Sequence, residues 1–75
     1  MPTITPAEQA DLDNWFTYHP ATPETLAHYK HVREVSKDLA KYILENLSPS
    51  ADRTAAVRSL RRSVMDINLA IACNK

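Results

Sequence analysis

Apolar residues recur at spacings of three and four along two long segments of the chain. In the C-terminal segment they are Val57, Leu60, Val64, Ile67 and Ile71. In the middle segment the comparable positions are Leu26, Tyr29, Val32, Leu39, Ile43 and Leu47. This spacing is typical of amphipathic helices that bury one face. The pattern therefore predicts two long helices whose apolar stripes pack against each other.

Capping signals mark where three helices should begin. Thr5 and Thr22 each precede a proline, and Glu8 follows Thr5 at the third helical position, as in a capping box. Ser50 can cap a third helix after the short turn at residues 47–50. The predicted helices cover about residues 5–16, 22–47 and 50–72.

The absence of glycine narrows both the fold and the function. Tight β-hairpins favour glycine-containing turns, so the chain is predicted to be all-α. Glycine-rich phosphate loops, dinucleotide fingerprints and nucleophile elbows also require glycine, and these enzyme motifs are excluded.

Length limits how the helices can be stabilised. A chain of 75 residues allows one domain, residues 1–75, and the short connection predicts a short N-terminal helix followed by a long antiparallel hairpin. Cores of chains this small rarely supply more than about 3–5 kcal/mol. Small residues at Ala56, Ser63 and Ala70 would let another helix approach closely. We therefore expect an oligomeric helical bundle made of several copies.

Charge and cysteine content suggest a cytoplasmic protein without a nucleic-acid polymer as partner. Nine Lys and Arg balance nine Asp and Glu, which argues against binding DNA or RNA by bulk charge. The single cysteine, Cys73, cannot form an internal disulfide. No signal peptide or membrane span is expected from the apolar pattern.

Aromatic and basic residues gather in the first half of the chain. Tyr18 and His19 lie in a predicted linker, and Lys30 and Arg33 share one helix face further on. Aromatic rings stack on nucleobases, and cations pair with phosphates. These four residues are the candidate ligand site, although Lys30 could instead pair with Glu34. The neighbouring aromatics Trp15, Phe16 and Tyr29 are more simply interpreted as packing residues of an oligomer.

Arginines on the third helix form a second candidate anion site. Arg58 and Arg61 are the main candidates, because Arg62 is expected to pair with Asp66, and Lys75 adds a further cation to the same C-terminal segment. A solvated helix face is the more common role of such residues. Asn68 interrupts an apolar run and would either set the register of a bundle or contact a ligand.

Catalysis and metal binding have little support in the sequence. His28 and His31 share a helix face, but two histidines without a further ligand make a weak metal site. Cys73 is poorly placed for a protected nucleophile. We therefore expect no enzyme activity, no metal and no cofactor.

Four short motifs together resemble a family of small phage proteins. They are residues 16–20 (FTYHP), 29–33 (YKHVR), 47–50 (LSPS) and 68–72 (NLAIA). In this combined order they resemble the anti-CBASS sponges, helical-hairpin proteins that phages use against cyclic-oligonucleotide antiphage signalling. The resemblance extends over about residues 12–73.

The resemblance implies a homohexamer that sequesters cyclic dinucleotides without degrading them. In some members a separate site also takes cyclic trinucleotides. Carried onto this chain, the motif residues are Tyr18, Lys30 and Arg33. Ile67 stands where a small residue is usual and Cys73 where a basic residue is common. The second departure puts a trinucleotide site in doubt, although Lys75 or a helix-three arginine could substitute.

Two other functions remain open on the sequence alone. One is a small DNA- or RNA-binding regulator, with Arg53, Arg58, Arg61 and Arg62 following the phosphates. The other is a protein-interaction module whose apolar stripe meets a partner helix.

Overall fold

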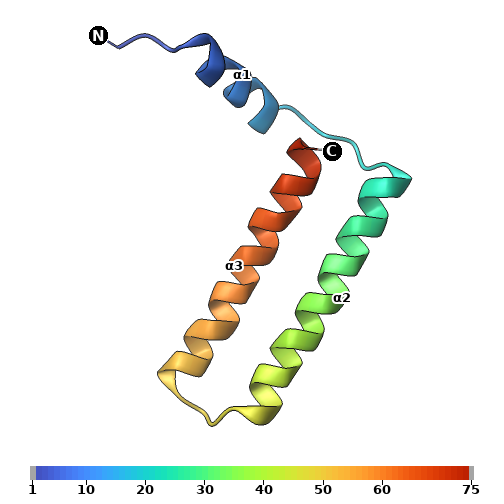
Figure 1. Cartoon of the computed structure of the whole chain (residues 1–75), viewed down its shortest axis with the longest axis vertical. Coiled ribbons are helices and arrows are strands. Elements are labelled where there is room, and N and C mark those ends of the chain that lie inside the picture. Colours follow the sequence, from blue (N-terminus) through green and yellow to red (C-terminus); the bar gives the residue numbers. More distant parts are fainter. Residues whose placement is uncertain (1, 75) are drawn as a thin grey trace.

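A computed structural model describes residues 2–74 as three helices without a strand (Figure 1). Helix α1 spans Pro6–Trp15, α2 spans Pro23–Asn46 and α3 spans Ala51–Cys73. The all-α prediction is confirmed for these residues. No helix among them is long and apolar enough to cross a membrane.

Each helix begins at the cap that the sequence indicates. The Thr5 hydroxyl accepts from the Glu8 backbone N–H, while Glu8 accepts from the N–H of Thr5 (3.0 Å). Thr22 and Thr25 form the corresponding reciprocal pair at the start of α2. The Ser50 side chain accepts from the third backbone N–H of α3. These bonds satisfy donors that a helix terminus otherwise leaves unpaired.

Helices α2 and α3 lie side by side and pack together, joined at the bottom of Figure 1 by a short connection. Half-buried positions on α3 include Val57, Leu60, Val64 and Ile71, four of the five predicted there; Ile67 is exposed. On α2 the half-buried positions are Tyr29, Val32, Ser36, Ala40 and Ile43.

The predicted stripe of α2 is therefore only partly correct. Leu26, Leu39 and Leu47 are exposed, while Ser36 and Ala40 take positions in the contact. Small side chains let two helices approach closely, so polarity alone does not decide which residues face the neighbour. The displaced leucines are left on the flanks of the helix pair.

The protein is flat and lacks an interior. Its Cα atoms span 50 × 38 × 13 Å, and the shortest extent is close to the diameter of one helix, about 10–12 Å with side chains. The radius of gyration is 16.9 Å, against about 11 Å for a compact chain of this length. Among residues 2–74 no hydrophobic residue is buried, and Thr25 alone is buried at all. The chain forms a single layer of helices.

Helix α1 extends away from the other two helices as an arm (Figure 1). The Asn14 side chain donates to the Cys73 carbonyl oxygen (3.0 Å), which ties the end of α1 to the end of α3. His19 Nε2 donates to the Asn14 carbonyl oxygen (2.7 Å). No residue of α1 is buried, and besides these polar contacts Trp15 lines a hollow with Leu69 and Cys73 of α3.

Candidate functional site

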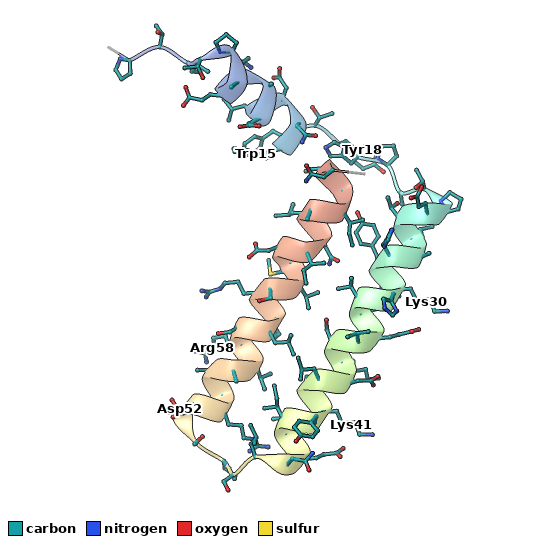
Figure 2. All side chains as sticks on the ribbon, viewed as in Figure 1. Trp15, Tyr18, Lys30, Lys41, Asp52 and Arg58 are labelled. Atoms are coloured by element: carbon teal, nitrogen blue, oxygen red, sulfur yellow. The ribbon has the colours of Figure 1, made fainter. Side chains whose placement is uncertain are left out.

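Two predicted site residues, Tyr18 and His19, lie in the linker between α1 and α2. Tyr18 is exposed, whereas His19 is hydrogen-bonded within the chain. Tyr18 is 85% exposed, and its ring lies near the C-terminal end of α3 (Figure 2). His19 is half-buried, and its Nε2 is already engaged with Asn14. The Thr17 hydroxyl donates to the Asp13 carbonyl oxygen, which fixes the start of the linker. Tyr18 therefore has a free aromatic face, whereas His19 holds the linker in place.

Lys30 and Arg33 are both exposed on α2, but they point in different directions. Lys30 projects from the outer side of α2, away from α3 (Figure 2). Arg33 lines a hollow of about 640 Å³ between the two helices. The other residues that line this hollow are Leu26, Tyr29, Met65, Asn68 and Leu69. Apolar walls with one guanidinium and one amide suit a planar polar ring.

One copy of the chain does not bring the predicted dinucleotide residues together. Tyr18 lies at the end of α3, while Lys30 lies further along α2 and faces outward (Figure 2). Arg33 alone of the four lines the hollow between the helices. A ligand that touched Tyr18 and Lys30 at once would need residues from more than one copy.

The second predicted anion site does come together on α3. Arg58 and Arg61 line one hollow of about 230 Å³ with Arg53, and no carboxylate is among its lining residues. The Arg53 Nη2 donates to the Leu44 carbonyl oxygen (2.7 Å), which fixes the guanidinium at the edge of the hollow. Its Nε is buried without a hydrogen-bond partner. Lys75, the third residue predicted for this site, lies outside the described residues.

The two hollows that contain arginines lie on one side of the helix pair. Leu26 lines the first hollow and Leu44 the second, and these residues are five full turns apart on α2. We call this side the arginine face. Its residues are Leu26, Tyr29, Arg33 and Leu44 of α2 with Arg53, Thr54, Val57, Arg58, Arg61, Met65, Asn68 and Leu69 of α3.

Within residues 2–74 the lysine and arginines of both candidate sites have no acidic partner. Among residues 2–74 the single ion pair joins Lys41 to Glu45 (3.7 Å). The pairing expected between Arg62 and Asp66 does not form, because spacing by four permits an exposed pair but supplies little energy to hold it. The alternative pair of Lys30 with Glu34 is also not formed.

Two residues of the arginine face were named from the sequence only as alternatives, Asn68 as a register or ligand residue and Arg53 as a phosphate contact of a nucleic-acid-binding regulator. Arg53 and Asn68 contain the buried polar side-chain atoms without a partner in the described part of the chain, Nε and Oδ1 respectively. Native proteins rarely leave such atoms unpaired. For Arg53 the sequence did offer a signal, because it lies about two turns from Arg61 on nearly the same side of α3.

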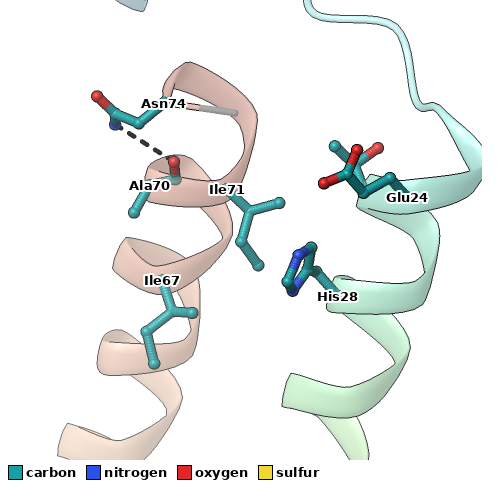
Figure 3. A pocket seen from close by; sticks show the side chains of 7 residues that line it. Glu24, His28, Ile67, Ala70, Ile71 and Asn74 are labelled. Carbon is teal, nitrogen blue, oxygen red and sulfur yellow. Dashed lines mark hydrogen bonds between the residues drawn. The ribbon is translucent and has the colours of Figure 1, made fainter.

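The opposite side of the helix pair contains a third hollow, of about 330 Å³, near the N-terminal end of α2 (Figure 3). Glu24 and His28 approach it from α2, while Ile67, Ile71 and Asn74 approach it from α3. The Asn74 side chain donates to the Ala70 carbonyl oxygen (3.2 Å). Like the larger hollow of the arginine face it has mostly apolar walls, but its charged lining residue is Glu24 and not an arginine.

Neither a cluster of metal ligands nor a similarity to a known protein indicates the function of this chain. No three His, Cys, Asp or Glu side chains gather to hold a metal ion within residues 2–74. Comparisons with protein-family models, with curated proteins and with solved structures find no match to this chain. The resemblance to the sponge family therefore rests on the short motifs of the sequence.

Proposed function

We propose that this protein binds cyclic oligonucleotide second messengers and sequesters them without cleaving them. The ligands are cyclic dinucleotides and, at the arginines of α3, cyclic trinucleotides. The protein acts as a homo-oligomer, a hexamer by resemblance to the phage sponges, in the cytoplasm of an infected bacterium. Removal of the messenger keeps the host's antiphage effector from being activated.

The observation that carries this proposal is the unpaired polar chemistry of the arginine face. Arg33, Arg58 and Arg61 have no acidic partner, and the Nε of Arg53 and the Oδ1 of Asn68 are buried without a hydrogen bond. Guanidinium groups left free of carboxylates suit phosphates, to which they donate paired hydrogen bonds. An amide beside apolar walls suits the edge of a nucleobase.

The separation of Tyr18 from Lys30 supports a ligand bound between copies. A cyclic dinucleotide has two bases and two phosphates related by near-twofold symmetry. A twofold contact between copies would present two tyrosines and two lysines to it. The exposed ring of Tyr18 and the outward direction of Lys30 are compatible with such a contact.

The energies are sufficient for tight binding. Each stacked base contributes about 1–3 kcal/mol and each charged hydrogen bond about 1.5–3 kcal/mol. Two of each sum to about 5–12 kcal/mol, and the upper end of this range matches the value of about 12 kcal/mol that nanomolar affinity requires when ordering costs are small. A site preformed by the oligomer keeps these costs small.

The test is calorimetry with a cyclic di-purine nucleotide, followed by chromatography of the ligand. We expect tight binding and recovery of the intact ring. Tyr18→Ala should weaken binding at least tenfold and leave the size of the oligomer unchanged, while Tyr18→Phe should retain most of the affinity. Linear products would indicate a phosphodiesterase, and loss of the oligomer in Tyr18→Ala would make Tyr18 a packing residue.

One observation favours a second candidate, a nucleic-acid-binding regulator. Three arginines share one hollow on α3, and arginines in a row can follow a phosphate backbone. Salt-dependent binding of duplex DNA, without affinity for any cyclic nucleotide, would support this alternative and exclude the sponge.

A further inference from the structure

The side of the helix pair opposite the arginine face contains no charged residue along most of its length. On α2 the positions that alternate in steps of four and three are His28, Val32, Val35, Leu39, Tyr42 and Asn46. On α3 the equivalent positions are Ala56, Leu60, Ser63, Ile67, Ala70 and Asn74. None of these twelve residues is Lys, Arg, Asp or Glu. We call this surface the uncharged face.

The hollow in Figure 3 shows that the two series belong to one surface. His28 of α2 lines it together with Ile67, Ala70 and Asn74 of α3, and Glu24 is the one carboxylate at this end of the surface. Val32 and Leu60 are half-buried because they also take part in the contact between the helices. Val35, Leu39 and Tyr42 are exposed in the single chain.

Steps of four and three are the repeat of helices that pack against other helices. In such bundles the apolar positions of one helix fit between those of its neighbour. Two adjacent helices that both carry the repeat form one half of a four-helix bundle. Small residues at 56, 63 and 70, seven apart on α3, leave room for the larger side chains of a facing helix.

We infer that a second copy of this chain packs on the uncharged face and completes a four-helix bundle there. This inference specifies the self-association included in the proposed function, and it leaves the arginine face open to ligand. A twofold contact places the same surface of both copies together, so an uncharged surface meets no like charge.

The exposed area supports a second copy as the occupant. The chain exposes 6385 Å², whereas a folded monomer of this mass exposes about 4,700 Å². One standard interface removes about 800 Å² per partner, which is about half of this excess of about 1,700 Å². Domains also require at least two packed layers, and this chain provides one. A second copy of the chain also lacks a second layer of helices, so pairing gives each copy the layer that it lacks.

Two leucines of α2 allow a matched test by sedimentation without nucleotide. Leu39 is 48% exposed on the uncharged face, and Leu44 is 50% exposed on the arginine face. We expect wild-type protein and Leu44→Glu to sediment as oligomers at micromolar concentration. Leu39→Glu should shift the protein to smaller species and lower its helical circular dichroism. Dissociation by Leu44→Glu but not by Leu39→Glu would overturn the inference.

A second measurement avoids the possibility that Leu39→Glu simply unfolds the chain. Ser63 lies on the uncharged face and Thr54 on the arginine face, and both are exposed in the single chain. In a Cys73→Ser background, Ser63→Cys should react with a thiol reagent at least tenfold more slowly than Thr54→Cys. Equal rates in an associated protein would overturn the inference.

The outcomes separate this inference from ligand binding. Assembly through the uncharged face without affinity for cyclic nucleotides would leave this inference standing and refute the sponge. A folded monomer at micromolar concentration would overturn the inference and indicate a partner of different sequence on this face.

Discussion

The two faces of the α2–α3 pair share one backbone but differ in charge. The arginine face contains Arg33, Arg58 and Arg61 without acidic partners, and both buried polar atoms that lack a hydrogen bond within residues 2–74 line its hollows. The twelve residues of the uncharged face include no Lys, Arg, Asp or Glu and no unpaired buried atom, and Glu24 is the one carboxylate in the hollow at its end. One face is suited to an anionic ligand and the other to another helix.

This difference indicates how so small a chain could combine assembly with binding. A helix has more than one side, and the contact between α2 and α3 uses only part of each. Burial of the uncharged face would add the second layer that the chain lacks. The arginine face would remain exposed to water. Water solvates its guanidinium groups, so they have no desolvation cost before a phosphate binds.

The largest effect is expected from removing charge on the arginine face. In the double variant Arg58→Gln and Arg61→Gln, each substitution removes a charged hydrogen bond of about 1.5–3 kcal/mol. Affinity for a cyclic trinucleotide should fall at least a hundredfold in calorimetry, while sedimentation should be unchanged. The matched control is Arg62→Gln, since Arg62 lies outside the hollow that Arg58 and Arg61 line. Equal losses in both proteins would mean that the arginines act through general charge.

A smaller effect is expected at Asn68. Its Oδ1 is buried without a partner, which costs about 1–3 kcal/mol in the folded state. Asn68→Leu should therefore raise the free energy of unfolding in urea by about 1 kcal/mol and weaken binding of the ligand. Asn14→Leu is the contrasting control, because Asn14 donates to the Cys73 carbonyl oxygen and its loss should destabilise the protein. A destabilised Asn68→Leu protein would show that Oδ1 has a partner in the assembly.

The sequence was sufficient to predict the helices but not which sides of them meet. Threonine before proline is a local signal, and Thr5 and Thr22 cap α1 and α2 as expected. The apolar stripe predicted for α2 included Leu39, which is exposed, and omitted Ala40, which is half-buried. Apolar residues occur on every helix side that packs against a neighbour, within the chain or in another copy. Hydrophobicity alone therefore cannot separate the α2–α3 contact from a contact between copies.

The candidate site was predicted in parts. Exposure of Tyr18 follows from its place in a linker, and the grouping of Arg58 with Arg61 follows from helical spacing. The unpaired atoms of Arg53 and Asn68 could not be predicted, because hydrogen-bond satisfaction depends on neighbours from another helix. The distance of Tyr18 from Lys30 likewise depends on how the linker folds.

The smallest effect is expected when the pH is lowered. It should affect the N-terminal cap of α1, which lies outside both faces. The N–H of Thr5 donates to Glu8 Oε1, and this bond, with a smaller effect of the Thr5 hydroxyl, holds the pKa of Glu8 below its usual value of 4.5. A lowered pKa stabilises the α1 cap above pH 4.5, and this stabilisation is lost as the pH falls through the lowered pKa. The amide resonance of Thr5 should report that transition by NMR, and Glu8→Gln should abolish it. A midpoint at or above 4.5 would mean that the cap does not form in solution. Loss of the assembly in the same pH range, also abolished by Glu8→Gln, would show that α1 contributes to contacts between copies and is not merely an arm beside the two faces.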